Sequence, residues 1–524
     1  MRTAACLVVA LAVLPAPARA GSPAVRYNDP VPVVPRAPLE RRIETLVADI
    51  AQKMRREPPR PDPRLAEAAS ELVRRMPADG RPPNDMVQAA LWLHGVVEPP
   101  PHLIVVTMGR DSEAEMLEEL RGQLPRALAQ GRYRRVAAAI HGAGDEIRVI
   151  VALQESALEL EPVPRALLHG GPAPLKGRLR APFQRPEAFV TAPDGQVTRL
   201  PLDGDATTFS GTFRCGPDKG RYQVELNGDD RYGATVLANF PVYCGVAAPA
   251  VLDTRAAPPE EKFTDAAAAE ATLHRLVNAD RARAGLPALA PDARLTQIAR
   301  AHSADMQAHG FVGHVSPSTG SAADRIRKAA VDAQLIMENV ARAYSPSEAE
   351  RGLMESPGHR ANILNREATH VGIGVVAADG VGGVKELLVT QLFIRPPDKL
   401  GPQSKDELRR RIDELRRQKG LKPLGSDATL DQVSQSTAED LARGRLTAER
   451  AGEPMDRALG RLAGKYRSVR SVVASAGGPS QVLGGLTHAV LDPTATTLGI
   501  GLGTGKRPDG SAVLYAVIVL ATGR

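Results

Sequence analysis

The chain has 524 residues, of which 43% are hydrophobic and 24% charged, so its composition is ordinary for globular domains and its length predicts several of them. Its formal charge of +7 is spread over the whole length without a dense basic block, and aromatic residues make up only 3% of the chain. These features argue against nucleic-acid binding, which needs concentrated positive charge and, on single strands, aromatic stacking platforms.

The first 20 residues have the pattern of a secretory signal sequence. Arg2 precedes an apolar run at 4–14, and Ala18-Arg19-Ala20 fits the small-x-small cleavage pattern. The apolar run is shorter than the roughly 20 residues that a membrane-spanning helix needs. We therefore expect a signal peptide at 1–20 and a secreted or periplasmic protein with no transmembrane anchor after cleavage.

We expect the first folded unit at residues 39–165. Apolar residues recur at helical spacing over 39–50 and again over 65–76. The apolar runs at 103–106 and 148–153 are typical of short buried strands. The pattern predicts a domain of mixed helices and strands.

A second unit is predicted at 183–246, after a Gly- and Pro-rich stretch at 166–182 that we interpret as a linker. Short alternating segments separated by turn residues predict a small β-sandwich of immunoglobulin-like type. The cysteine–tryptophan–cysteine spacing of true immunoglobulin domains is missing. Because paired thiols usually oxidise outside the cell, we predict a disulfide between Cys215 and Cys244, with two separate buried thiols as the alternative.

The central unit, at 264–397, contains three short polar motifs. His314 lies in the first (310–317) and His359 in the third (356–364), and between them a segment carries Glu338. Histidine and glutamate are well suited to bind a divalent ion or to exchange protons near neutral pH. Each histidine follows a glycine in a break between predicted elements, so both rings could project from loops into a common cleft.

The order of the motifs in this unit resembles the bacterial branch of the CAP superfamily. That superfamily groups cysteine-rich secretory, antigen-five and pathogenesis-related proteins, and its module is also called the SCP domain. The resemblance covers about a quarter of the chain. It is carried by RARAGLPAL, D-x-x-L, F-x-x-H-x-S-P, E-N-V-A, S-P-G-H-R-A-N-I-L and V-G-I-G-V, in that order over residues 281–375.

The resemblance implies an α/β/α sandwich and a cleft lined by two histidines and acidic groups, in which some members bind zinc. It puts His314, Glu338 and His359 in that cleft, with the two histidines as metal ligands. This chain departs from the family at Leu353, where a tryptophan usually precedes the second histidine motif. A second cleft glutamate has no clear match, and Glu355 is the nearest candidate.

The C-terminal unit, at 404–524, repeats part of the central one. Residues 285–295 and 420–430 are identical at six of eleven positions, and 368–374 resembles 495–501. This internal similarity predicts a degenerate CAP-like copy. In the N-terminal unit, six residues between Asp62 and Gly80 recur at one constant offset in the central unit, which predicts a third and more faded copy.

The copies do not repeat the polar set. At the same offsets, His314 falls on Asn84 in the first unit and on Glu449 in the third, and neither unit offers a clear counterpart of Glu338. Apolar positions therefore recur while the full His/Glu set occurs once, which indicates a site in the central unit. The alternative is a polar cluster that divergence erased without consequence.

These observations favour a secreted binding module over an enzyme. The ligands that the resemblance implies are hydrophobic small molecules, such as sterols or fatty acids, or envelope and extracellular components. A metal-dependent hydrolase or peptidase is the first alternative, with His314 and His359 holding zinc and Glu338 as general base, although no HExxH motif is present. A structural envelope protein is the second.

Overall fold

The computed structural model describes residues 25–32, 35–76, 80, 82–109, 112–252, 263–379, 385–396, 400–401, 403–460, 464–476, 479–506 and 512–523. The predicted signal peptide lies outside them. The chain divides into two units. The first comprises residues 1–230, 235–259 and 381–383, and the second comprises 231–234, 260–380 and 384–524. In the described part of the chain, no helix combines the length and apolarity needed to cross a bilayer.

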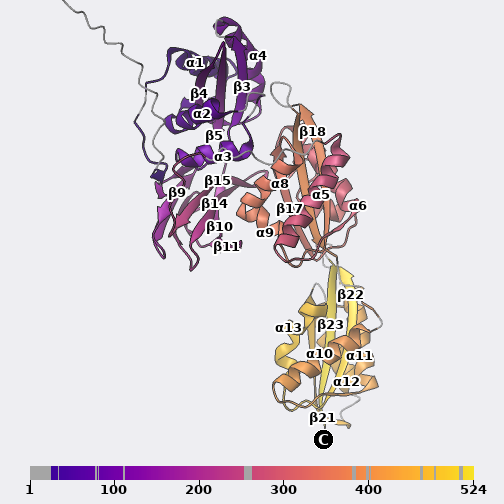
Figure 1. The fold of residues 1–524 in the computed structure, drawn as a ribbon. Coiled ribbons are helices and arrows are strands. Elements are labelled where there is room, and N and C mark those ends of the chain that lie inside the picture. The colour runs from indigo at the N-terminus through magenta and orange to yellow at the C-terminus, as the bar shows by residue number, and fades with distance from the viewer. Residues whose placement is uncertain are drawn as a thin grey trace, which may run out of the picture. The chain divides into compact units, whose positions relative to one another are not determined.

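The N-terminal domain of unit 1 is a four-stranded sheet covered by helices (Figure 1). Alternate residues of one strand face opposite sides, so Val149 and Val151 pack with α1 and α4 while Ile150 and Ala152 pack with α2 and α3. The prediction of a mixed α/β unit is confirmed. Its elements are α1 Pro38–Lys53, β2 Arg60–Pro61, α2 Pro63–Arg75, α3 Asn84–Leu93, β3 His102–Gly109, α4 Glu113–Ala129, β4 Tyr133–Ala143 and β5 Glu146–Glu155.

The rest of unit 1 is built from two β-sheets with the strand orders β11-β10-β14-β15-β8 and β12-β13-β9-β6. Buried residues of both sheets, such as Phe213 and Phe240, share one apolar core. The strands are β6 Leu158–Leu160, β8 Ala166–Leu167, β9 Pro172–Leu179, β10 Gln184–Thr191, β11 Val197–Leu200, β12 Asp203–Gly204, β13 Thr208–Arg214, β14 Gly220–Asp230 and β15 Gly233–Cys244, and a separate pair consists of β1 Arg26–Tyr27 and β7 Val163–Pro164.

The disulfide predicted in this part is confirmed, since the Sγ atoms of Cys215 and Cys244 are bonded. The predicted linker at 166–182 is wrong, because β9 occupies much of it and pairs with β13. Buried Ala173 and Leu175 alternate with exposed residues along β9. Because the stretch is rich in glycine and proline, its composition indicated a linker, and the alternation of buried and exposed residues was missed.

The central domain in unit 2 has the strand order β16-β18-β19-β17. Along β19, Val389 and Phe393 pack with α5 and α8, while Leu392 and Ile394 pack with α6 and α7, so both faces of the sheet are covered. Its elements are α5 Ala266–Arg283, β16 Ala290–Pro291, α6 Ala293–His309, α7 Ala322–Lys328, β17 Leu335–Ala343, α8 Pro346–Glu355, α9 Pro357–Ile363, β18 His370–Asp379 and β19 Lys385–Arg395.

The glycines of the V-G-I-G-V motif let α6 lie directly on the sheet. A Cβ atom at Gly372 would come within 2.2 Å of the Leu295 side chain, and one at Gly374 within 2.0 Å of the Arg300 main chain. Val371, Ile373 and Val375, which alternate with these glycines, are buried in the core under α5 and α8. The motif is therefore a packing device in which glycine is needed on one face and a branched side chain on the other.

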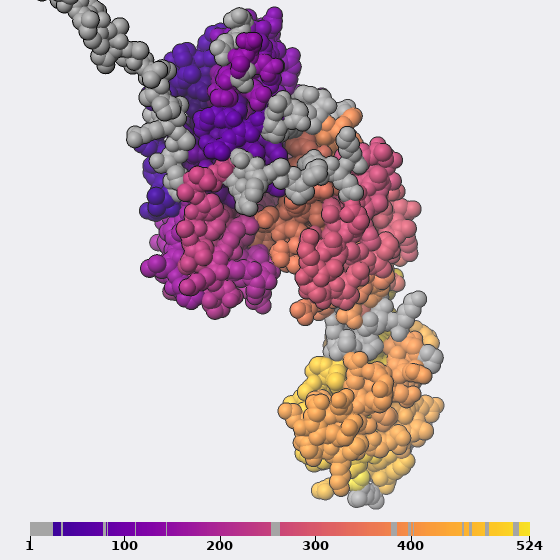
Figure 2. Space-filling model, viewed as in Figure 1, coloured from indigo at the N-terminus to yellow at the C-terminus, as the bar shows by residue number. Residues whose placement is uncertain are grey.

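The C-terminal domain has the order β20-β22-β23-β21. Gly499 and Gly501 of β22 approach α11 as closely as the central glycines approach α6. In Figure 2, orange atoms of residues near 400–460 cover much of the visible face of this domain. Its elements are α10 Ser404–Gln418, β20 Gly425–Ser426, α11 Ala428–Ala442, α12 Gly452–Gly460, β21 Tyr466–Ala476, α13 Pro479–Val490, β22 Thr497–Lys506 and β23 Ala512–Gly523.

Candidate functional site

His314 lies in the loop between α6 and α7, and the main chain of that loop is held from several sides. Its amide nitrogen donates to the carbonyl of Tyr232 at 2.7 Å, within the segment 231–234 that belongs to unit 2. The buried His302 bonds through Nε2 to the carbonyl of Gly313 at 2.9 Å. Arg325 donates to the carbonyl of His314 at 3.3 Å. These contacts fix the backbone from which the His314 ring projects.

The His314 ring is oriented by Glu338 of β17. The distance from His314 Nδ1 to Glu338 Oε1 is 3.1 Å, and Arg325 of α7 pairs with the other carboxylate oxygen, Oε2. Because a carboxylate only accepts hydrogen bonds, Nδ1 of His314 must carry a proton, which makes Nε2 the nitrogen that a neutral ring would offer to a ligand. Both oxygens of Glu338 are thus occupied by protein donors.

Glu338 is ionised although it is only 7% exposed. Burial by itself would raise the pKa of this carboxyl group. The hydrogen bond from His314 and the positive charge of Arg325 outweigh burial and hold the pKa of Glu338 below its ordinary value. The group acts as a fixed negative charge beside the His314 ring.

His359 is the third residue of α9, a short helix with Pro357 in its first turn. Its Nδ1 lies 2.8 Å from the Ser356 hydroxyl oxygen. Burial, followed by the neighbouring His314, lowers the pKa of His359 to about 3, so the ring is neutral at physiological pH. The centroids of the His314 and His359 rings are 6.3 Å apart.

Buried amides connect the second and third motifs. Asn339 donates to the carbonyl of His359 at 3.2 Å and to Gln391 Oε1 at 3.0 Å. Asn362 donates to the carbonyl of Glu338 at 3.2 Å and to Asn339 Oδ1 at 2.9 Å. The asparagines of the two motifs therefore tie α9 to β17 and set the distance between the histidines.

The structure brings together three of the four predicted cleft residues. His314, Glu338 and His359 are neighbours, whereas Glu355 is exposed at the end of α8. Arg325 and Gln391 were not among the predicted site residues. Arg325 lies in an unremarkable charged helix and carried no signal, but a glutamine inside the apolar run of β19 could have been noticed as a buried polar group.

Two imidazoles are the available donors for a metal ion. Within the described residues, no three His, Cys, Asp or Glu side chains are grouped so that they could hold a metal together. A histidine that gives its second nitrogen to a buried carboxylate is nevertheless the usual arrangement behind a metal ligand, and His314 with Glu338 has it. The residues fit an ion held by two histidines, with Glu338 behind them.

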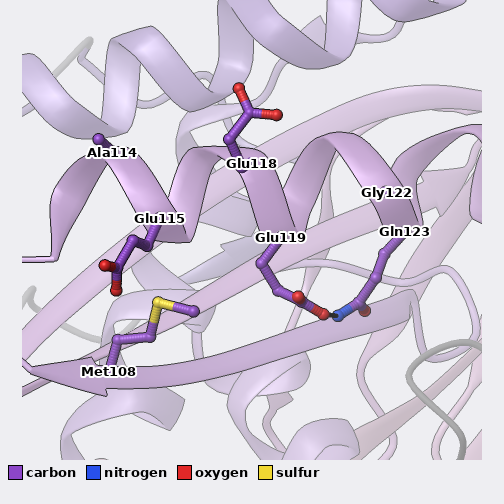
Figure 3. A pocket seen from close by; sticks show the side chains of 7 residues that line it. All are labelled: Met108, Ala114, Glu115, Glu118, Glu119, Gly122 and Gln123. Carbon is purple, nitrogen blue, oxygen red and sulfur yellow. Dashed lines mark hydrogen bonds between the residues drawn. The ribbon is translucent and has the colours of Figure 1, made fainter.

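A hollow in the N-terminal domain is lined by Met108 of β3 and by several residues of α4 (Figure 3). Figure 3 shows Glu118 pointing away from Glu115 and Met108, and Glu119 hydrogen-bonded to Gln123 at 2.6 Å. The carboxylates do not converge on a common point. We therefore place the candidate site in the central domain.

The fold and the site define a class: an α/β domain with a helix-covered four-stranded sheet that displays two histidines above a buried glutamate. Residues 274–393 match the model of the cysteine-rich secretory protein family, CAP. This segment is a CAP domain, so the predicted membership of the superfamily is confirmed.

Among curated relatives, the uncharacterized protein YkwD of Bacillus subtilis is 36% identical over 113 residues, which are 21% of this chain and 44% of the relative. The uncharacterized membrane protein YlbC of the same organism is 39% identical over 102 residues, 19% of this chain and 29% of the relative. The chain thus spans less than half the length of either. An extracellular SCP-domain protein from Bacillus anthracis shows 20% identity and a TM-score of 0.23, covering 46% of this chain and 87% of that one.

Proposed function

We propose that this chain is an exported binding protein whose CAP domain uses the cleft between His314 and His359. The observation that carries the proposal is the way the two rings are held. Nδ1 of each ring faces a protein partner, Glu338 or Ser356, so a ligand would be met by Nε2, with the Nδ1–H of His359 donating to the Ser356 hydroxyl. Side chains fixed in this way are prepared for binding.

Zinc is the ion that this donor set suits. Two neutral imidazoles would hold it through Nε2, and the remaining coordination positions would be filled by water or by oxygen atoms of a ligand. A bound zinc ion would supply a Lewis-acid centre at the mouth of the cleft. Neutral His359 needs no deprotonation before it binds, since its pKa is far below physiological pH.

The contacts of Glu338 favour binding over hydrolysis. A general base must have a free lone pair within reach of the proton that it removes. Both oxygens of Glu338 already accept from His314 and Arg325, and the group is buried, so its position suits the orientation of a ring better than proton transfer. We therefore favour a binding module over the metal-dependent hydrolase or peptidase in which Glu338 is the base.

Zinc titration of the full chain by calorimetry tests the metal part of the proposal. We expect His314→Ala and His359→Ala each to weaken zinc affinity by about tenfold or more, since each removes one of two ligands. His309→Ala is the matched control, because His309 is an exposed histidine of the same domain that pairs with Asp305. Unchanged affinity in both cleft variants would contradict the proposal.

The organic ligand is proposed from the resemblance alone. A hydrophobic small molecule or an envelope component would occupy the cleft of an exported CAP protein, and the disulfide of unit 1 supports a location outside the cytoplasm. Mass spectrometry of lipids that co-purify with the exported chain checks this class. Recovery of none, together with no uptake of added lipid, would favour a structural envelope protein.

We infer that the N- and C-terminal domains are degenerate copies of the central one and that the two β-sheets of unit 1 form an immunoglobulin-like sandwich. All three helix-flanked sheets place their four strands, numbered along the chain, in the order 1-3-4-2. In each, the short first strand pairs in parallel with the third. The copies would then serve as scaffold or as separate contact surfaces without a histidine pair.

A further inference from the structure

Glu350 of α8 is a buried acid behind the cleft. It is 2% exposed, and its Oε2 accepts a hydrogen bond from Gln391 Nε2 at 2.8 Å. Its other oxygen, Oε1, has no hydrogen-bond donor among the described residues. A buried carboxylate oxygen without a donor carries a large desolvation penalty, so protonation of Glu350 would be favourable here.

Asp280 of α5 provides the acceptor for that proton. It is 8% exposed, α5 packs against α8, and the two carboxyl groups are within hydrogen-bonding reach of each other. Two carboxyl groups can bond to one another only if one of them is protonated. Arg283 forms an ion pair with Asp280, whereas Oε1 of Glu350 has no donor among the described residues, so the shared proton is assigned to Glu350.

The other groups named around Glu350 do little to stabilise its ionised form, because they are neutral or exposed to solvent. Gln391 of β19 and, behind it, Asn339 of β17 are neutral amides, and His359 of α9 is a neutral ring. Arg283 is a cation that acts on Glu350, and its side chain is 73% exposed. Burial, opposed by the Gln391 hydrogen bond and reinforced by the charge of Asp280, raises the pKa of Glu350 to about 8.

A chain of hydrogen bonds leads from Glu350 to the cleft. The amide of Gln391 is oriented at both ends, since Nε2 faces Glu350 and Oε1 accepts from Asn339. The same Asn339 amide donates to the carbonyl of His359. Any shift of Gln391 is therefore passed through one asparagine to the main chain that carries the His359 ring.

We propose that Glu350 and Asp280 form a proton-binding pair that positions His359 through Gln391 and Asn339. Loss of the shared proton would leave two negative charges buried side by side, which pushes α8 away from α5 and frees the Gln391 amide to turn. The inference deepens the proposed function, because it makes the geometry of the cleft depend on pH. It needs no bound metal.

The test uses the full chain in the absence of metal, labelled with ¹⁵N-histidine. The His359 ring signals are assigned by their loss in His359→Gln, and their positions are followed from pH 6 to 9.5. We expect a step centred near pH 8 in the wild type. Glu350→Gln should abolish the step and keep the signals at their low-pH positions, because a glutamine mimics the protonated acid.

Asp280→Asn supplies a second measurement. It removes the neighbouring negative charge, so the step should move to lower pH. Glu367→Gln, at an exposed glutamate of the same domain, should leave the step unchanged. A wild type without a step, or the same midpoint in Glu350→Gln, overturns the proposal; if Glu350→Gln does not fold, an unmoved midpoint in Asp280→Asn does so. Because no zinc is present, failure here is distinguishable from failure of the zinc titration.

Discussion

At the scale of single residues, the arrangement of His314 depends on which partners bond to the two oxygens of a buried carboxylate. Glu338 uses one to fix the tautomer of His314 and the other to neutralise Arg325, which is itself 6% exposed. It lies on β17, an edge strand held by its pairing with β19, so its position beside the ring is fixed by the sheet. Because it is a carboxylate at this position, Glu338 orients the His314 ring.

Glu338→Gln tests that role. The substitution keeps the shape of the side chain but removes its charge, so Arg325 is left buried and unpaired, and we expect a loss of about 3 to 5 kcal/mol of stability. Zinc affinity should fall by about 10- to 100-fold, because the group behind a metal ligand is weakened. Thermal unfolding and zinc titration of the same samples provide the measurement.

The pH dependence of stability is the internal control. The pKa of Glu338 is lower in the folded state than its ordinary value of 4.5, so its stabilisation is present above that value and is lost as the pH falls through the folded pKa. This acid-sensitive part should be absent from Glu338→Gln. An equal loss on acidification in both proteins would show that Glu338 is not its source.

At the scale of elements, sequence patterns predicted the helices and strands that depend on residues close to one another in the chain. The strands predicted at 103–106 and 148–153 lie within β3 and β5, and the helical spacing over 39–50 and 65–76 corresponds to α1 and α2. β17 was not predicted as a strand, because buried Glu338 and Asn339 interrupt its alternation of apolar residues.

The approach of the two histidines could be predicted only through the resemblance. Forty-five positions separate His314 from His359 in the sequence, and their distance is set by Asn339 and Asn362, which bond across the fold. Periodicity and composition carry no information about such contacts. Sequence reasoning found the residues that bear the chemistry and missed Arg325 and Gln391, which hold them.

Gly374→Ala tests the packing of α6 on β18. The added Cβ atom would lie 2.0 Å from the Arg300 main chain, so helix and sheet must separate. We expect a loss of about 1 to 3 kcal/mol, seen as a lower transition temperature of the CAP domain in calorimetry. Gly352→Ala is the matched control. Gly352 lies within α8 with open space around it, so alanine there should stabilise the helix by up to about 1 kcal/mol.

At the scale of the whole molecule, the central and C-terminal domains each contain a buried arginine that bonds to main-chain carbonyls of its own domain. Arg281 is 1% exposed and donates to the carbonyls of Pro287, Ile363, Asn365 and Ala368. Arg416 is 2% exposed and donates to the carbonyls of Lys422, Val490, Asp492 and Ala495. The first carbonyl lies six residues after the arginine in both domains, and the other three follow one another at the same intervals. The packing device is present in both domains, whereas the histidine pair is a feature of the central one.

Loss of the buried arginine in the C-terminal domain should therefore lower the stability of that domain without changing zinc binding by the central one. Arg416→Met keeps much of the buried side-chain volume but leaves several buried carbonyls without donors, so we expect the C-terminal domain to lose about 3 kcal/mol or more. Zinc affinity should stay within about twofold, with one ion per chain, since the cleft lies in another domain. Arg281→Met, the matched variant, should lower both the stability of the CAP domain and its zinc affinity, because Arg281 holds the end of α9 through the carbonyl of Ile363. Calorimetry and zinc titration of both variants measure this difference, and an equal loss of zinc binding in the two would contradict the assignment of the site to the central domain alone.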